Sequence, residues 1–501
     1  IKNPIDKLKL DKREMFELYC PRLQKTPAAF ATISIGLIFT NADEDNFEEL
    51  FSFFRDTLYP QYETVTGIGA EVKDIFPAVL RQESGHMSKK AAKDLVSWLI
   101  EPDYSAEQRE PLELDNRQKG LIEGRTETGF RRLRGPAGSG KSVVLAGRAA
   151  KIAMEEKDVL VISLNRTLPN YLIDLCVRFA RCRNKITWWH YHGWLKRAFY
   201  RNGIGGIWDA TWVNHFNNNN DEDDYALTKI LQITMATLFI ENIVNSTFDD
   251  DDKYDAIFVD EGQDISPEIW QSLRKALRPE GEMWIFADTT QDIYENAHRW
   301  TEVAMEGAGF RGPWINLPFS YRLPPNLITF AVEFINLFFE GEGALKPKLP
   351  SQTQLDLFPC NLRYKSTSHE KSVQTCFDEL MRLITTDDDR ERAMADLTLI
   401  TDNIKHGKDV RKLLKEKGIK TIAAFTKRQK SMFYKGAPRV KLCTIHSFKG
   451  WEGRLLVIYI SNASHAVVYT AITRSKRHKD GSYLTIVSSN DRYNQIQGLI
   501  N

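Results

Sequence analysis

The sequence has no large excess of one charge, few cysteines and no long hydrophobic run. Its 68 lysines and arginines nearly balance its 67 aspartates and glutamates, so any nucleic-acid-binding surface must be a local patch. Six cysteines in 501 residues, with no CxxC pair, exclude a disulfide framework, argue against zinc and predict a reducing, cytoplasmic setting. The longest largely apolar run, Phe30–Phe39, is ten residues, too short to cross a bilayer, so we expect no membrane partner. No signal peptide is visible, and because the sequence begins at Ile1 rather than at methionine, we expect it to be a fragment.

What the sequence does have, from Gln118 onward, is an alternation of short apolar runs and helical patterns. This alternation predicts an α/β fold with a largely parallel sheet, whose buried strands read as continuous apolar runs. The candidate strands are Phe130–Arg134, Val159–Ser163, Ala256–Val259, Met283–Ala287, Leu397–Ile400, Lys441–Thr444, Leu455–Ile460 and Leu484–Val487.

One segment reads GPAGSGKS and matches the pattern GxxxxGK[ST]. Glycines let such a loop curl so that its N–H groups point at phosphates, and the helix that follows adds a positive dipole. The glycines of this segment are Gly135, Gly138 and Gly140. Lys141 would reach the β- and γ-phosphates, and the Ser142 hydroxyl would bind Mg²⁺. We therefore predict a nucleotide site, the alternative being an ordinary glycine-rich turn.

A second segment, YDAIFVDEGQD, is an apolar strand pattern that ends in two acids. Such a strand is the expected second half of a nucleotide site. Asp260 would hold Mg²⁺ through water, and Glu261 would polarise the attacking water. The alternative is that the two acids only cap the N-terminus of a helix.

Further patterns surround these two segments. They read LDNRQ, VISLNRTLPNYL, TWWHYHGW, ADTTQDIY, PFSYRLPPNLI, KLCTIHSFKGWEG and VVYTAITRSKR. In this order and combination, over residues 114 to 477, the chain resembles superfamily 1 DNA helicases of the UvrD/Rep kind, whose corresponding late motif reads TLHSxKGLEF. The resemblance implies two RecA-like parallel-sheet P-loop domains, ATP with Mg²⁺, and movement along single-stranded nucleic acid, DNA in preference to RNA, in the 3′-to-5′ direction.

The resemblance also assigns residues to the nucleotide. It implies that Gln118 reads adenine, that Tyr321 stacks on adenine and that Glu452 lies near the ribose. The implied γ-phosphate contacts are Gln291, Arg322 and Arg474. An arginine donated from an adjacent domain stabilises the transferring phosphoryl group and is worth about 10³–10⁵ in rate. For a single arginine, the alternative is a surface ion pair.

On the nucleic-acid side, the implied contacts are Asn165, His192, Tyr294, Thr444, His446 and Lys449. His190 and His192 could instead be core or capping residues, as buried histidines often are. Basic clusters offer phosphate contacts whose affinity would fall with salt, although a solvated helix face is the favoured interpretation of the last cluster. These clusters lie at residues 131–134, 178–185 and 408–417.

The motif positions predict three parts. Residues 1–110 form an N-terminal α/β module, 111–313 a first RecA-like domain with a short insertion at about 194–252, and 314–501 a second RecA-like domain. Strand patterns fill part of the gap from Arg322 to Thr444, so we expect the large insertion that the family often carries there to be absent or vestigial. NPIDKL and TISIGLIF in the N-terminal module resemble the tail of nuclease-related domains fused to some bacterial helicases; the alternative is an inert docking domain.

The predicted function is therefore an ATP-dependent helicase or translocase, acting in DNA repair or in anti-phage defence, with a nuclease domain or subunit as a partner. An alternative is an ATP-gated switch that binds nucleic acid or protein without unwinding, beside a nuclease. A small-molecule P-loop kinase is a third interpretation, but it has no use for the YR, HSxKG and TR motifs.

Overall fold

A computed structural model describes residues 35–39, 63–67 and 112–500, except for 113, 177, 180–184, 219–232, 244–251, 294–296, 340–343, 351–358, 387–393, 431–432, 434–438 and 479. The chain divides into two compact units, Ile1–Ser105 and Ala106–Asn501. In the first unit, β1 (Ile35–Phe39) and β2 (Glu63–Gly67) pair in parallel. The rest of the predicted N-terminal module lies outside the described residues. Within the described ranges, no helix is both long enough and apolar enough to span a membrane.

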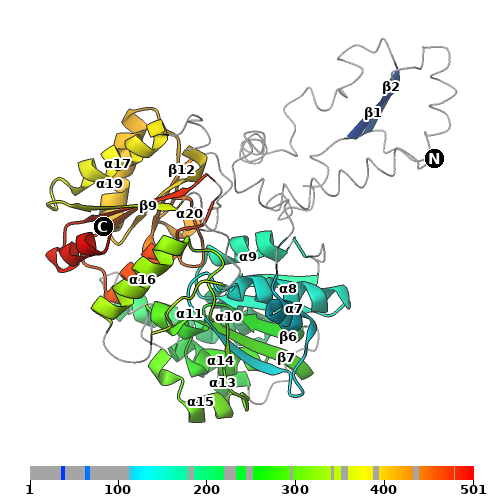
Figure 1. The fold of residues 1–501 in the computed structure, drawn as a ribbon. Helices are drawn as coiled ribbons and strands as arrows, with labels where there is room; N and C mark the ends of the chain where they lie inside the picture. Colours follow the sequence, from blue (N-terminus) through cyan, green and yellow to red (C-terminus); the bar gives the residue numbers. More distant parts are fainter. Residues whose placement is uncertain are drawn as a thin grey trace. The chain divides into compact units, whose positions relative to one another are not determined.

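The second unit contains two six-stranded sheets, and Figure 1 shows the first in cyan to green. The strand order of the first sheet is β5-β4-β6-β7-β3-β8, and all its neighbours pair in parallel. Its strands are β3 (Phe130–Arg134), β4 (Val159–Ser163), β5 (Ile186–His190), β6 (Tyr254–Val259), β7 (Leu277–Ala287) and β8 (Ile315–Asn316). The helices of this part are α7 (Asn116–Glu123), α8 (Lys141–Met154), α9 (Leu168–Cys176), α10 (Tyr191–Arg201), α11 (Gly205–Asn218), α13 (Met235–Ile243), α14 (Pro267–Arg274) and α15 (Glu302–Gly307), with 3-10 turns η8 (Gly262–Asp264), η9 (Thr289–Gln291) and η10 (Ala297–Arg299).

The second sheet, yellow to red in Figure 1, has the order β11-β12-β10-β13-β14-β9 and is also parallel throughout. Its strands are β9 (Cys360–Ser366), β10 (Leu397–Thr401), β11 (Thr421–Ala424), β12 (Val440–Thr444), β13 (Leu455–Ile460) and β14 (Ser482–Ser488). Its helices are α16 (Pro325–Phe338), α17 (Ser372–Thr386), α19 (Ile404–Glu416), α20 (Lys427–Lys430), α21 (Ile445–Phe448), α22 (His465–Ile472) and the 3-10 helix η11 (Asp491–Leu499).

Successive side chains of an inner strand point to opposite faces of the sheet, and in β4, β10, β12 and β13 both faces are buried. In β4, Val159 and Val161 join the apolar core that contains α8 and α9, whereas Leu160 and Ile162 join the core that contains α10, α13 and α14. The second sheet is covered in the same way by α17 and α19 on one face and by α16 and α22 on the other. The core under α8 and α9 continues without a break to α16 and α22, so apolar packing links the two sheets.

These sheets confirm the predicted α/β class with two parallel-sheet domains. The strands predicted from apolar runs all form, and most of them begin and end within two residues of the predicted limits. The exception is β7, which begins at Leu277, six residues before the predicted Met283. The edge strands β5, β8, β9 and β11 were not predicted.

A buried ion pair joins α8 to β7 and also holds the end of α7. The Arg148 guanidinium donates to both carboxylate oxygens of Glu282, at 2.5 and 3.2 Å, and to the carbonyls of Ile122 and Glu123 at 3.0 and 3.1 Å. Arg148 and Glu282 are only 5% and 6% exposed, so each charge depends on the other for compensation. The pair therefore fixes α7, which begins at the predicted adenine-reading segment.

We expect Glu282→Gln to lower the free energy of unfolding by about 3–5 kcal/mol, because it leaves the Arg148 charge buried without its partner. Chemical denaturation followed by circular dichroism would measure the change. Arg125→Ala is the matched control: Arg125 also approaches Glu282, at 3.5 Å, but its side chain is 39% exposed. The control should cost less than about 1 kcal/mol. Equal losses in the two variants would contradict the role given to burial.

Candidate active site

The glycine loop connects β3 to α8, so the N-terminus of a 14-residue helix faces the loop. Gly138 and Gly140 have φ angles of 76° and 84°, which glycine adopts without strain. A Cβ atom at Gly138 would collide with the hydroxyl of Ser320, and one at Gly140 with the side chain of Gln118. Both backbone shape and close neighbours therefore require these two glycines.

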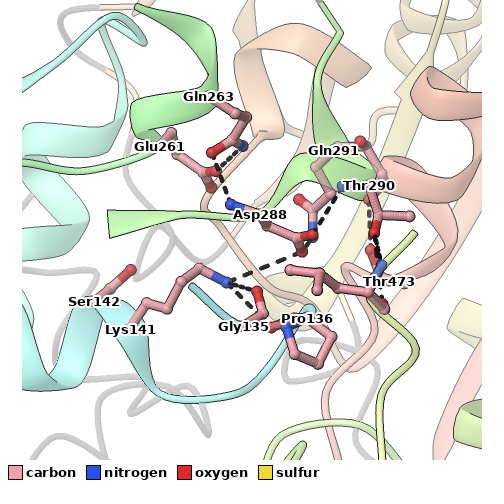
Figure 2. Close-up of polar contacts among 12 residues, drawn as sticks. Gly135, Pro136, Lys141, Ser142, Glu261, Gln263, Asp288, Thr290, Gln291 and Thr473 are labelled. Carbon is pink, nitrogen blue, oxygen red and sulfur yellow. Dashed lines mark hydrogen bonds and ion pairs between the residues drawn. The ribbon is translucent and has the colours of Figure 1, made fainter. Parts of the chain in front are cut away.

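Lys141, the first residue of α8, directs its ammonium group back over the loop. It donates to the carbonyls of Gly135 and Pro136 at 2.6 and 3.1 Å and lies 3.9 Å from a carboxylate oxygen of Asp288, which follows β7. Figure 2 shows this ammonium pointing toward Asp288. Burial lowers the pKa of Lys141, although Asp288 opposes the shift. A buried cation at a helix N-terminus is an environment suited to an anionic ligand.

The two acids that follow β6 have different partners. Asp260 accepts a hydrogen bond from the Ser142 hydroxyl at 2.9 Å and another from the backbone N–H of Glu261 at 3.0 Å. Burial raises the pKa of Asp260 to about 6, and the neighbouring Glu261 charge adds to the shift. The oxygens of Ser142 and Asp260 are thus adjacent, as a shared oxygen-ligated cation would require.

Glu261 has φ of 53°, a left-handed conformation that is uncommon for a residue with a side chain. Its carboxylate accepts from Gln263 at 2.7 Å, and Gln263 in turn accepts from the N–H of Asp288 at 2.9 Å. Burial alone would raise the pKa of Glu261, but the charges of Lys449, Arg474 and Lys141 lower it. Glu261 stands before η8, yet its side chain makes no capping hydrogen bond there.

Gln291 and Arg474 meet at this site although they come from opposite sheets. Gln291 ends η9 and donates to Asp288 at 2.7 Å, while its amide oxygen accepts from the Arg474 guanidinium. Arg474 follows α22 and also donates to the carbonyl of Thr470 at 2.9 Å. Burial and the neighbouring Arg322 lower the pKa of Arg474 to about 10, a value at which arginine remains charged at neutral pH.

Arg322 lies on the segment that leads into α16 and is tied to the loop that carries Arg474. Its guanidinium donates to the carbonyl of Thr473 at 2.6 Å, and its own carbonyl accepts from the N–H of Arg477 at 2.7 Å. Arg322 also lies 3.9 Å from Glu452, which pairs with Lys476 at 3.2 Å. The two predicted arginines and Glu452 are thus brought together.

The predicted adenine residues lie against the glycine loop. Asp115 and Gln118 form a capping box at the start of α7, in which the N–H of Gln118 donates to Asp115 at 2.6 Å. The Tyr321 hydroxyl also donates to the Asp115 carboxylate. Tyr321 is 41% exposed, whereas Gln118 is buried beside Gly140. Gln118 and Tyr321 therefore share Asp115 as a partner, which the sequence interpretation did not foresee.

Several predicted nucleic-acid contacts form a row of polar groups that spans the two sheets. At the end of β4, the Asn165 amide donates to the carbonyl of His446 at 3.1 Å. The next residue, Arg166, contacts the His190 ring at 2.9 Å, and the rings of His190 and His192 are 6.4 Å apart. His446 is exposed. Arg166 was not predicted, although its place three residues after an apolar strand was a usable signal.

Other predicted contacts have local structural roles. Thr444 caps α21 by accepting from the N–H of Ser447 at 3.1 Å, and His190 caps α10 by accepting from the N–H of Gly193 at 2.9 Å. Capping was the alternative considered for His190. Tyr294 lies outside the described residues. The nucleic-acid roles of these residues stay predictions.

Lys449, expected near the nucleic-acid backbone, is buried among the acids of the first sheet. Its ammonium donates to both carboxylate oxygens of Asp264 at 2.7 and 2.8 Å and to the carbonyl of Gln291 at 2.7 Å. It lies 3.9 Å from Glu261. The sequence interpretation missed the parts played by Asp264 and Asp288, because the pairing depends on contacts between distant segments.

Comparison with known proteins adds little to this description. The sequence matches no family model and no curated protein. Among solved structures, it is similar to Dbp5 of S. cerevisiae bound to RNA and ADP BeF3, with 12% identity and a TM-score of 0.44, covering 81% of this chain and 90% of that chain. A variant of Dbp5 in the same complex gives 11% identity and a TM-score of 0.45 over the same shares. Likeness at this level does not carry a function from one protein to another.

We expect Asp260→Asn to stabilise the fold in Mg²⁺-free buffer at pH 8 but not at pH 4. The folded-state pKa of Asp260 is raised from 3.8 to about 6, so the stability that its protonated form contributes is lost as pH rises through 6. Asparagine cannot ionise, so the variant should gain up to about 3 kcal/mol above that pH. Unfolding curves of both proteins at the two pH values test this; a gain that is the same at both would contradict it.

Proposed function

We propose that this chain is an ATP-driven motor, resembling superfamily 1 helicases, that moves along single-stranded nucleic acid. One observation carries the proposal: Arg474, from the side of the second sheet, is buried against Gln291 and shares its surroundings with Glu261. An arginine delivered across a domain boundary to a glycine loop and an acid pair suits the cleavage of a nucleoside triphosphate, whose transferring group spreads negative charge over its oxygens.

Residues from both sheets would take part in ATP hydrolysis. The N–H groups of the glycine loop and Lys141 would hold the phosphates. Glu261, whose pKa is lowered by the surrounding cations, stays ionised and would take the proton of the attacking water. Arg322 and Arg474 would stabilise the charge that develops on the γ-phosphoryl group, with Gln291 joining Arg474 to the first sheet.

The residues also fit Mg²⁺, which prefers oxygen ligands and keeps several of its waters. The Ser142 hydroxyl and the Asp260 carboxylate would hold it, their oxygens being 2.9 Å apart. Mg²⁺ bound with ATP neutralises charge on the β- and γ-phosphates.

Coupling to nucleic acid is supported by one short loop. His446 is exposed at the end of the second sheet, and Lys449, three residues later, contacts Asp264 and approaches Glu261. A nucleic-acid strand bound by Asn165, Arg166, His192 and His446 would therefore contact α21. The residue that follows this helix, Lys449, lies beside the proposed catalytic acid Glu261. Cycles of ATP binding and hydrolysis that change the relation of the two sheets would then move the strand.

The finer parts of the proposal come from the motif resemblance: DNA as the track, 3′-to-5′ movement, a role in DNA repair or anti-phage defence, and a nuclease partner. The alternative of a switch that hydrolyses ATP without unwinding makes a different prediction in a single assay. A duplex with a single-stranded tail would be separated by a helicase and left paired by a switch.

We expect Glu261→Gln to bind ATP but to lose almost all turnover, because the amide cannot accept the proton of water. Arg474→Ala should also bind ATP and should hydrolyse it about 10³-fold more slowly. Filter binding of ATP and steady-state phosphate release measure the two effects. Glu268→Gln, which alters an acid on α14 paired with Arg299 at 2.6 Å, is the matched control and should keep normal turnover. Near-normal turnover in Glu261→Gln would show that another group is the base.

We expect single-stranded nucleic acid to stimulate ATP hydrolysis by the full chain at least about tenfold, and the affinity for the strand to fall steeply with salt because phosphate contacts release counterions. Phosphate release should be measured with no nucleic acid, single-stranded DNA, duplex DNA and RNA, which also identifies the track. Hydrolysis that ignores every nucleic acid would contradict a motor and favour the switch.

A further inference from the structure

The segment after β4 is joined by hydrogen bonds to α21 and to the loop that follows it, and the groups at the centre of this contact are buried. The Trp451 indole N–H donates to the Thr167 hydroxyl oxygen at 2.9 Å. The Thr167 hydroxyl lies 2.6 Å from the carbonyl of Ser447, to which it donates, and 3.0 Å from the Asn165 amide oxygen. Asn165 itself donates to the carbonyl of Lys449 at 2.7 Å. We call this set, Asn165, Thr167, Ser447, Lys449 and Trp451, the interdomain latch.

The centre of the latch is closed to water and tightly packed, whereas Asn165 is half-buried. Thr167 and Trp451 are both fully buried. The Trp451 ring packs 5.6 Å from that of Tyr171 and 5.5 Å from that of Phe433. At Gly450, where φ is 86°, a Cβ atom would collide with Leu168. Since no water can replace a broken hydrogen bond at Thr167 or Trp451, the bonds of these two residues matter most to the position of the loop.

The position of the loop sets the position of Lys449. The backbone carbonyl of Lys449 accepts a hydrogen bond from the Asn165 side chain. Two residues after Lys449, the Trp451 indole donates to Thr167. The Lys449 ammonium is thereby placed on Asp264 and 3.9 Å from Glu261. The leucine of the helicase motif, at the place of Trp451, has no side-chain N–H to donate, so this bond depends on the tryptophan that this chain carries.

We propose that Thr167 and Trp451 are positioning residues: through the latch they hold Lys449 beside the catalytic acid, and so set the rate of ATP hydrolysis rather than the affinity for ATP. The inference rests on the proposed function. None of the latch residues belongs to the glycine loop or to the adenine residues Gln118 and Tyr321, so ATP binding should be nearly independent of the latch.

The test uses Thr167→Val, which removes the hydroxyl and keeps the branched shape. We expect kcat for stimulated ATP hydrolysis to fall five- to twentyfold and KM for ATP to change less than twofold. Thr167→Ser, which restores the hydroxyl, should recover most of the rate. Trp451→Phe should cause a similar fall, and the double variant Thr167→Val with Trp451→Phe should be no slower than the slower single variant, because both remove the same bond.

Trp270→Phe is the matched control. Trp270 is also fully buried and its indole donates to the carbonyl of Ala308 at 3.0 Å, but within the core of the first sheet. This variant should melt at a lower temperature and keep normal kcat. A normal kcat in Thr167→Val, a failure of Thr167→Ser to restore the rate, or an equal fall in Trp270→Phe would each overturn the proposal.

Hydrogen exchange separates this proposal from the proposed function, because it needs no ATP hydrolysis. In the full chain, amides of residues 446–451 should exchange at least tenfold faster in Thr167→Val than in the unmodified protein, and at the normal rate in Trp270→Phe. Faster exchange supports the latch even if the chain proves not to hydrolyse ATP. Unchanged exchange would overturn the latch even where hydrolysis is normal.

Discussion

The structure depends most on the pairing of buried charges where the two sheets meet. The side of the first sheet carries buried charges at Lys141, Asp260, Glu261, Asp264 and Asp288. The side of the second sheet adds the buried cations Lys449 and Arg474. An unpaired buried charge costs much more free energy than a paired one, so the acids of the first side are poorly compensated without the second. In the proposed motor, the phosphates of the nucleotide would interact with the same cations. ATP and ADP would therefore differ in how strongly they favour the contact between the two sheets.

The sequence predicted the inner strands of the two sheets and missed their edges. Most inner strands are buried on both faces and flanked by partners, so they read as apolar runs such as Val159–Ser163, whereas β3, which reads FRRLR, was predicted from its place before the glycine loop. The edge strands are β5, β8, β9 and β11. They are short, or mix polar with apolar residues as β9 does with Arg363 and Lys365, because one side of an edge has no partner strand.

Part of the candidate site could likewise be predicted from the sequence, and part could not. The glycine loop, Lys141, Ser142 and the pair Asp260 and Glu261 could be predicted because each lies in a short local pattern tied to a strand end. The burial of Lys449 against Asp264 could not, since it joins residues 185 positions apart. Contacts between distant segments have no local signature, and a single sequence contains no other information about them.

The left-handed backbone at Glu261 limits how this site can change over evolution. A residue with φ of 53° turns the chain so that successive carboxylates diverge, Asp260 toward Ser142 and Glu261 toward Gln263. β-Branched residues are strained in that conformation, and glycine, which adopts it freely, has no carboxylate. A lineage in which glycine replaced this acid would keep the turn and lose the carboxylate that we propose as the catalytic base. Such a descendant would be a folded protein that retains the proposed nucleotide site for binding alone.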